Sequence, residues 1–172
     1  MIAFRHADPR FPFLRESAPQ SAGRWHAPGE LTHYFCDTPD GAWAEFLRHE
    51  EIDDPQDVAT IRRAIWAVSI DAEPALEPDL PLDVLTGGPE SWPACQRFAQ
   101  RHRAEETGMT APSAALRPGG AHGWRVDGGT TPGPARNGRV FALFGTRPDL
   151  VGWAATIAGR PSEELLADVI HF

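Results

Sequence analysis

The residues best suited to chemistry in this sequence gather in its first 50 positions. Arg5, Arg24, Tyr34 and Glu45 each lie in an apolar or Gly/Pro-containing neighbourhood. A guanidinium can form paired hydrogen bonds with a phosphate or carboxylate, because its N–H groups lie in one plane. Tyr34 adds an aromatic ring, and Glu45 adds a carboxylate. Brought together by the fold, these four side chains would suit a ligand that is both anionic and flat, such as a dinucleotide.

Each of these residues also has a structural explanation. The arginines could form surface ion pairs with acidic neighbours such as Glu16. Tyr34 is the single tyrosine of the chain and could be a strand aromatic packed in the core, with its hydroxyl bonded to the backbone. Glu45 could be a solvated helix charge beside Arg48 and His49. Residue types alone leave both explanations open.

Several other kinds of chemistry lack their motifs. All 16 basic residues are arginine, which excludes a lysine Schiff base or a P-loop lysine. None of the seven histidines forms an H-E-x-x-H motif, and Cys36 and Cys95 are far apart, so we expect no metal site. Neither a G-x-G-x-x-G motif after a strand nor a G-x-S-x-G motif is present, which argues against a Rossmann site and a hydrolase triad. The net charge of −8 argues against general binding to nucleic acid or anionic membranes.

The elements that must position these residues can be read from local patterns. Expected strands are 2–6, 31–36, 64–70, 109–113 and 139–145, from their β-branched and aromatic content. The strand at 64–70 follows a short helical lead-in, and a helix throughout 59–71 is the alternative. Expected helices are 39–51, 82–86, 92–107 and 148–158, and residues 165–172 are either a helical turn or an edge strand. Strands and helices mix without strict alternation, which indicates an α+β fold.

Caps and loops refine this outline. Asp37 or Thr38 can cap the helix at 39–51, and Ser91 and Gly108 are expected to cap the helix at 92–107. A Pro/Gly/Ser-bearing loop spans 7–28, and loops of this length are more often functional than idle. The glycine-rich segment 117–138 is an exposed loop or hairpin.

Length and composition predict one domain with a packed core, because the chain has 172 residues, 41% of them hydrophobic, and six tryptophans. Both cysteines are expected to be buried free thiols. Residues 1–13 carry arginines and prolines instead of the apolar stretch of a signal peptide, and no apolar run reaches transmembrane length. We therefore expect a soluble, cytoplasmic protein.

The motifs together resemble the RES family. The resemblance rests on Phe4-Arg5, a GRW unit followed by Gly29 (GRWHAPG), a His-Tyr-Phe strand at 33–35, an Ala-x-x-Glu helix ending at Glu45, and Ser113 in GMTAPSA. A Trp-x-x-Cys-Gln helix at 92–96 and a final apolar strand extend it over most of the chain. The clearest departure is His26, where the family usually carries asparagine.

This resemblance implies an ADP-ribosyltransferase-like split mixed β-sheet with flanking helices, formed by a single RES domain over residues 1–172. It implies an NAD⁺-degrading toxin of a type II toxin–antitoxin system, which cleaves the nicotinamide–ribose bond with water or phosphate as acceptor. An ADP-ribosyltransferase that modifies a protein, with 117–138 as its docking loop, is the alternative. A non-enzymatic partner-binding domain is the second alternative.

The resemblance also implies roles for individual residues. Arg5 and Arg24 would hold the phosphates of NAD⁺, Tyr34 would position its nicotinamide end, and Glu45 would face the ribosyl cation. Ser113 would help to orient the leaving amide. NAD⁺ is then the substrate, with no separate cofactor and no metal. The implied partner is a cognate antitoxin with a helix-turn-helix domain. The implied assembly is either a homodimer or a toxin–antitoxin hetero-oligomer.

Overall fold

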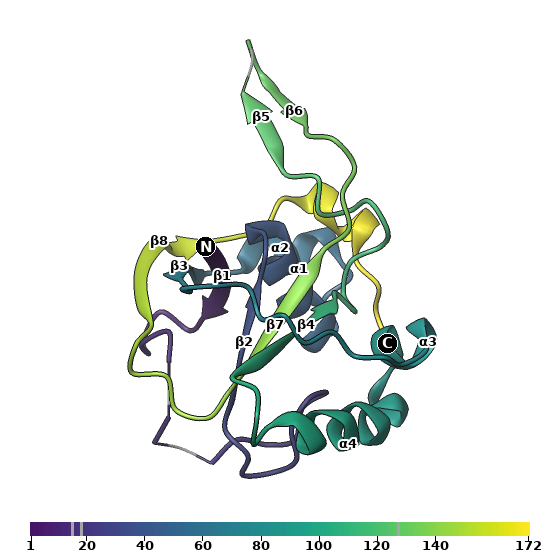
Figure 1. The fold of residues 1–172 in the computed structure, drawn as a ribbon. Helices are drawn as coiled ribbons and strands as arrows, with labels where there is room; N and C mark the ends of the chain where they lie inside the picture. Colours follow the sequence, from purple (N-terminus) through teal and green to yellow (C-terminus); the bar gives the residue numbers. More distant parts are fainter. Residues whose placement is uncertain (15, 18, 127) are drawn as a thin grey trace.

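The structure is a computed structural model that describes residues 1–14, 16–17, 19–126 and 128–172. Arg15 and Ala18 of the expected loop at 7–28, and Asp127 of the segment 117–138, lie outside the described residues. A six-stranded sheet in the order β4-β7-β2-β1-β3-β8 forms the framework (Figure 1). Its strands are β1 (Ile2–Ala7), β2 (Thr32–Cys36), β3 (Arg63–Ser69), β4 (Gly108–Pro112), β7 (Arg139–Phe144) and β8 (Val151–Gly159).

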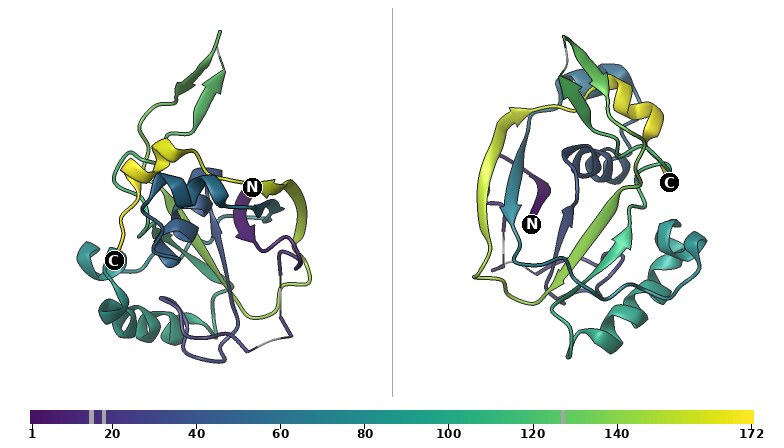
Figure 2. Two further views of the ribbon diagram at one scale, coloured as in Figure 1. Left: turned by 180° about the vertical axis from the view of Figure 1, so that it is seen from behind. Right: turned by 45° about the horizontal axis from the view of Figure 1, so that its top comes forward.

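The sheet is divided at its centre. β1 pairs with β3 at six positions and β2 pairs with β7 at five, but β1 and β2 are joined only through Phe4 and Cys36. The first helix, α1 (Pro39–His49), lies between the two halves (Figure 2). The expected α+β class and the split of the sheet are therefore confirmed. The expectation of a mixed sheet needs correction, since every strand pair among the described residues is antiparallel.

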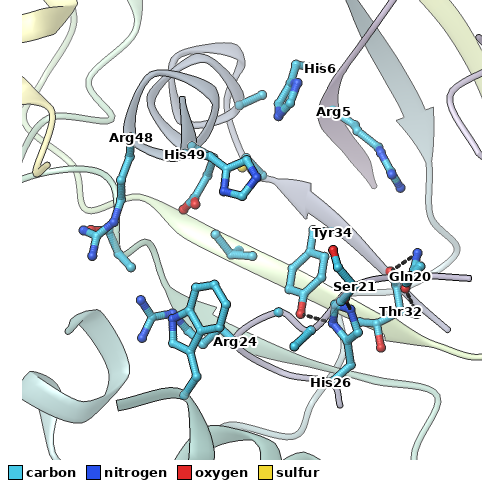
Figure 3. A pocket seen from close by; sticks show the side chains of 18 of the residues that line it. Arg5, His6, Gln20, Ser21, Arg24, His26, Thr32, Tyr34, Arg48 and His49 are labelled. Carbon is cyan, nitrogen blue, oxygen red and sulfur yellow. Dashed lines mark hydrogen bonds between the residues drawn. The ribbon is translucent and has the colours of Figure 1, made fainter. Parts of the chain in front are cut away.

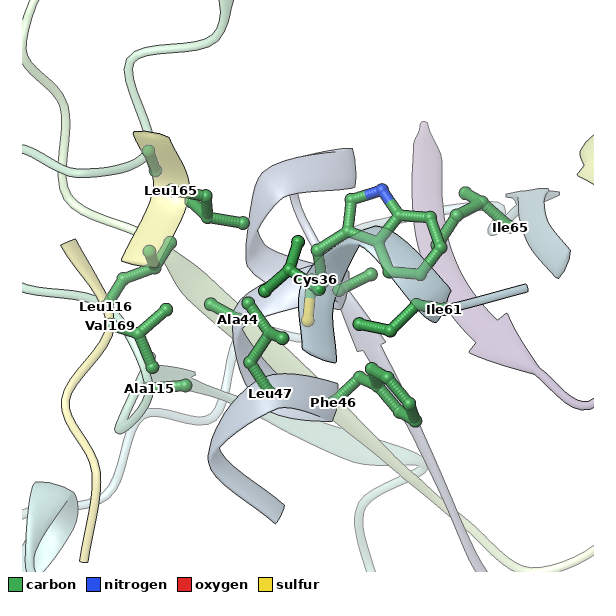
Figure 4. Packing of buried hydrophobic residues seen from close by; sticks show 14 of the residues in the cluster. Cys36, Ala44, Phe46, Leu47, Ile61, Ile65, Ala115, Leu116, Leu165 and Val169 are labelled. Atoms are coloured by element: carbon green, nitrogen blue, oxygen red, sulfur yellow. The ribbon is translucent and has the colours of Figure 1, made fainter. Parts of the chain in front are cut away.

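Local chemistry explains why α1 forms where it does. Thr38 is the N-cap, and its hydroxyl oxygen accepts a hydrogen bond from the Gly41 amide at 3.0 Å. Pro39 occupies the first turn, where a missing N–H costs nothing. The helix buries Ala44, Phe46 and Leu47 in a core cluster (Figure 4) that also contains residues from α2 (Pro55–Thr60) and the C-terminal segment. This packing fixes the helix against both halves of the sheet.

The second long helix, α4 (Trp92–His102), is shorter than expected. Ser91 does not cap it, because its hydroxyl donates to the Gly88 carbonyl instead, at 2.8 Å. Gly108 is not a helix cap but the first residue of β4. A Cβ atom at Gly108 would lie 2.7 Å from the Ala142 carbonyl oxygen, so glycine permits the close approach of β4 and β7. The short helix α3 (Leu82–Thr86) forms as expected.

The expectation of a helix at 148–158 is wrong, because this segment forms the edge strand β8 paired with β3. Its sequence, VGWAATIAG, combines β-branched and aromatic residues with two glycines, which favours a strand once a partner is available. Gly152 is also required by packing, since a Cβ atom there would lie 2.9 Å from the ring of Phe13. A tertiary neighbour thus overrides the local helical pattern.

The remaining segments are irregular or peripheral. Residues 163–168 form a 3₁₀ helix (η2, Glu163–Asp168), and Val169 then forms an isolated bridge with Leu116. A second 3₁₀ turn (η1, Pro89–Ser91) precedes α4. The segment 117–138 contains the hairpin of β5 (Trp124–Val126) and β6 (Thr130–Pro132), which projects from the body of the molecule (Figure 1). Both cysteines are buried free thiols, as expected. Among the described residues, no helix has the length and apolar character needed to cross a membrane.

We predict that Thr38→Ala lowers the free energy of unfolding by about 1 kcal/mol, because it removes the hydroxyl oxygen that accepts from the Gly41 amide. Urea unfolding followed by circular dichroism measures the change. Thr38→Ser keeps the oxygen and serves as the matched control. An equal loss in both variants would show that the methyl group, and not the cap, provides the stability.

Candidate active site

A cavity of about 490 Å³ opens where β1 and β2 diverge (Figure 3). This volume is in the range of small-molecule sites, roughly 300–1,000 Å³. Four of the five residues singled out in the sequence line it: Arg5, Arg24, Tyr34 and Glu45. The remaining wall comes from β1, β2, β7, α1, α4, the loop before β2, the segment after β4 and the C-terminal segment. Its residues are Phe4, His6, Pro19, Gln20, Ser21, Ala22, Gly23, His26, Thr32, Cys36, Ala42, Arg48, His49, Trp92, Ala114, Val140 and Phe172.

Arg5 and His6 bring two largely buried basic groups to the β1 side of the cavity (Figure 3). Burial lowers the pKa of Arg5 to about 10, so its guanidinium stays cationic at neutral pH. The Arg5 guanidinium lies 5.8 Å from the ring centroid of Phe35, and its Nη1 has no hydrogen-bond partner among the described residues. Burial, assisted by Arg63 and Arg5, lowers the pKa of His6 to about 3, so this imidazole is neutral. Arg5 is therefore a cation that no carboxylate of the described chain neutralises.

Arg24 reaches across the cavity to the segment between α3 and α4. Its guanidinium donates to the carbonyl oxygens of Val84 at 3.2 Å and Gly87 at 2.5 Å, and to the Ser91 hydroxyl at 3.2 Å. The alternative of an ion pair with Glu16 does not apply, since that carboxylate accepts from His33 at 3.0 Å. Backbone carbonyls hold Arg24 in place without cancelling its charge.

Glu45 projects from α1 into the same cavity. Its Oε1 accepts a hydrogen bond from the Ser113 hydroxyl at 3.1 Å. Burial raises the pKa of Glu45 above its usual value, while the Ser113 hydrogen bond and the cations Arg48 and Arg24 oppose that rise. Ser113 itself is only 5% exposed, and its neighbour Ala114 forms the cavity wall. The structure thus brings the Ser113 hydroxyl against the Glu45 carboxylate, and the residues that line the cavity include Glu45 but not Ser113.

Arg48 is a site residue that the sequence analysis treated only as a possible partner of Glu45. It is 4% exposed, and its guanidinium donates to four backbone carbonyls, those of Thr86, Gly87, Ala114 and Ile170. The sequence spacing indicated that Arg48 belongs to the site, because residues three apart on a helix share a face and Glu45 projects into the cavity. Arg48 and Arg24 both donate to the Gly87 carbonyl, so two cations converge beside one carboxylate.

Tyr34 combines the two explanations proposed for it. It lines the cavity, and its hydroxyl is bonded within the protein: the oxygen accepts from the Trp25 amide at 3.0 Å and lies 2.8 Å from Nδ1 of His26. Burial raises the pKa of the Tyr34 hydroxyl well above its usual value, so the group stays protonated. The side chain of Gln96 on α4 holds the neighbouring segment 23–26 in place by donating to the Gly23 carbonyl at 2.9 Å.

Comparison with known proteins adds three findings. The family model described as RES domain matches residues 2–125. No curated protein matches the chain. Among solved structures, the M. tuberculosis MbcT–MbcA toxin–antitoxin complex contains a chain that is similar with a TM-score of 0.56 and 14% sequence identity. The likeness covers 96% of this chain and 86% of the other, and at this identity it establishes similarity of fold.

We predict that the neutral, largely buried His6 makes the protein less stable in acid. Its folded-state pKa of about 3 lies below the usual 6.5, so the unfolded chain binds a proton that the folded chain excludes. The contribution of His6 to the free energy of unfolding is fully present above pH 6.5 and is lost as the pH decreases toward 3. Between pH 7.5 and 5.0 the loss from His6 is about 2 kcal/mol.

Urea unfolding of wild type and His6→Gln at both pH values measures this contribution. The difference in free energy of unfolding between wild type and His6→Gln should decrease by about 2 kcal/mol between pH 7.5 and pH 5.0. Arg97→Ala, at an exposed position of α4 outside the cavity, is the control and should leave the pH dependence unchanged. A constant difference between wild type and His6→Gln would contradict the prediction.

Proposed function

The chain belongs to the RES domain family, and we propose that it is an NAD⁺-cleaving toxin of a toxin–antitoxin pair. The observation that carries this proposal is the convergence of Arg5, Arg24, Tyr34 and Glu45 on one cavity at the split of the sheet. Two cations, an aromatic ring and a carboxylate match the phosphates, the flat base and the reacting ribose of a dinucleotide. The whole of residues 1–172 acts as one catalytic domain in this proposal.

The reaction breaks the bond between the nicotinamide nitrogen and C1″ of the ribose. The electron pair of that bond leaves with nicotinamide, which is cationic in NAD⁺ and departs as a neutral base without a general acid. The ribose carbon passes through an oxocarbenium-like state, and an oxygen of water or phosphate adds to it and loses its proton to solvent. Glu45 stabilises the positive charge as it develops, in the way carboxylates do in glycoside cleavage.

Binding and positioning fall to the other residues. Arg5 holds a phosphate, supported by the absence of any ion pair to it in the described chain. Arg24 contributes the N–H groups that its carbonyl partners leave free. The Tyr34 ring packs against the nicotinamide end. Ser113 acts through Glu45, whose carboxylate it fixes, instead of touching the leaving amide itself.

The proposed partner is a cognate antitoxin that carries a helix-turn-helix domain and covers the cavity. The fold similarity to a chain of the MbcT–MbcA toxin–antitoxin complex supports this class of partner. Substrate access then depends on whether the antitoxin is bound.

We predict that the purified protein converts NAD⁺ to ADP-ribose in plain buffer, or to ADP-ribose 1″-phosphate when inorganic phosphate is present. Glu45→Gln should lower kcat by at least about 100-fold, because the amide cannot offset the developing positive charge. Arg24→Ala should raise KM as well as lower kcat. Chromatography of the products measures each effect, and Arg97→Ala on the exposed side of α4 is the matched control.

Undiminished NAD⁺ consumption by folded Glu45→Gln would overturn the site assignment. NAD⁺ that stays intact with and without phosphate would overturn the proposed consumption of free NAD⁺. Transfer of label from NAD⁺ to a protein in a lysate would then support the ADP-ribosyltransferase alternative. The projecting hairpin of β5 and β6, with Trp124 and Val126 exposed, would be the docking element to test.

We further predict that Ser113→Ala lowers kcat by about 10-fold with little change in KM, because the residue fixes Glu45 without contacting the substrate. The lost hydrogen bond also raises the pKa of Glu45, so the acidic limb of the kcat profile should move to higher pH. Steady-state kinetics from pH 4.5 to 8 measures both effects, with Ser69→Ala as the control. A reduced kcat with an unshifted profile would contradict the role assigned to Ser113.

A further inference from the structure

Both nitrogens of the His26 ring are engaged. Nε2 lies 2.7 Å from the Ser21 carbonyl oxygen, and Nδ1 lies 2.8 Å from the Tyr34 hydroxyl oxygen. The residue is only 5% exposed. Figure 3 shows Ser21, His26 and Tyr34 together at one end of the cavity. The ring thus connects the loop before β2 to a side chain that lines the cavity.

These contacts determine where the protons lie. A carbonyl oxygen can only accept a hydrogen bond, so Nε2 of His26 carries the hydrogen that it donates to Ser21. In a neutral imidazole the other nitrogen is then an acceptor, and Nδ1 accepts from the Tyr34 hydroxyl. The Tyr34 oxygen also accepts from the Trp25 amide. The hydroxyl proton of Tyr34 therefore points at His26 and away from the cavity.

The surrounding turn prevents the ring from moving away. Gly23 and His26 form a pair of backbone hydrogen bonds of 3.1 and 3.4 Å. A Cβ atom at Gly23 would lie 2.4 Å from Cε1 of His26, so the imidazole packs directly on the Gly23 backbone. Arg103 holds the adjacent Trp25 carbonyl at 3.0 Å. A change in the proton count of His26 must consequently be taken up by Tyr34 and not by a ring swing.

We propose that His26 is a positioning residue whose neutral ring keeps the Tyr34 hydroxyl proton out of the cavity, and whose protonation turns that proton toward the ligand. An imidazolium has two N–H donors and no acceptor. The Tyr34 oxygen would then accept from both His26 and Trp25, and its own O–H would have to point elsewhere. Tyr34 thus offers a bound ligand an acceptor at neutral pH and a donor in acid.

The charged groups around the pair set the direction of this switch. Burial lowers the pKa of His26, Arg103 lowers it further, and the Ser21 carbonyl and Glu30 oppose the decrease. Tyr34 is influenced by the cations Arg103 and Arg24 and by the carboxylate of Glu45, and the last two line the cavity. The protonation of His26, and with it the turn of the Tyr34 hydroxyl, therefore occurs below the usual histidine pKa of 6.5.

The first test is independent of any catalytic activity. Long-range ¹H–¹⁵N correlation spectra of protein labelled at histidine should show His26 as the Nε2–H tautomer at pH 7.5. The His26→Asn variant assigns the signal, because it removes one histidine of the seven. An Nδ1–H tautomer, or an average of both tautomers, would overturn the inference whether or not the protein cleaves NAD⁺.

The second test rests on the proposed function and uses NAD⁺ consumption from pH 5.5 to 8. Asparagine at position 26 can accept from Tyr34 through Oδ1 but does not titrate. His26→Asn should therefore lose the part of the pH dependence of kcat/KM that comes from His26, whatever its kcat/KM at pH 7.5. As the pH is lowered below 6.5, wild type should change kcat/KM by at least about 3-fold beyond the change seen in His26→Asn.

Tyr34→Phe should also lack this acid step, the change in kcat/KM at low pH, since phenylalanine has no hydroxyl to turn. An acid step of equal size in wild type, His26→Asn and Tyr34→Phe would assign it to another group and overturn the kinetic part of the inference. A wild-type protein inactive toward NAD⁺ would instead count against the proposed function, while the tautomer measurement would still decide the role of His26.

Discussion

The single pairing between β1 and β2 is the constraint on which the rest of the structure depends. Phe4 and Cys36 hold the two halves of the sheet together, and beyond them the strands separate. Side chains of the diverging strands, such as Arg5 on β1 and Tyr34 on β2, line a shared cavity. Helix α1 lies between the halves and adds Glu45 from above the opening. A continuous sheet would leave no room for a ligand at this position.

Arginine–carbonyl contacts stabilise the walls of this opening. Arg24, Arg48 and Arg103 all donate to backbone carbonyl oxygens of distant segments. A carbonyl orients a guanidinium without neutralising it, so the positive charge remains available to a ligand. A protein with a net charge of −8 can in this way present a locally cationic site. Arg48 and Arg24 oppose the rise that burial causes in the pKa of Glu45, and they thereby favour its ionised form.

Hydrogen bonds between side chains decide how the reactive groups are presented. Ser113 is buried and fixes Glu45, while His26 determines the direction of the Tyr34 hydroxyl. Both supporting residues act through a side chain that reaches the cavity. The chemistry proposed for Glu45 and Tyr34 therefore depends on a layer of contacts that residue type alone does not reveal.

The sequence by itself determined the first two strands and helix α1, because strand alternation, an N-cap and a helical apolar face are local properties. The residues that meet at the cavity were indicated by the family motifs, since residue types alone left a structural explanation open for each of them. Only the tertiary structure decided that residues 151–159 form a strand, since the partner β3 lies far away in the sequence. It also decided the role of Arg48, whose carbonyl partners at Ala114 and Ile170 are 66 and 122 positions distant. Local patterns specify elements, whereas contacts between distant segments specify which side chains support a site.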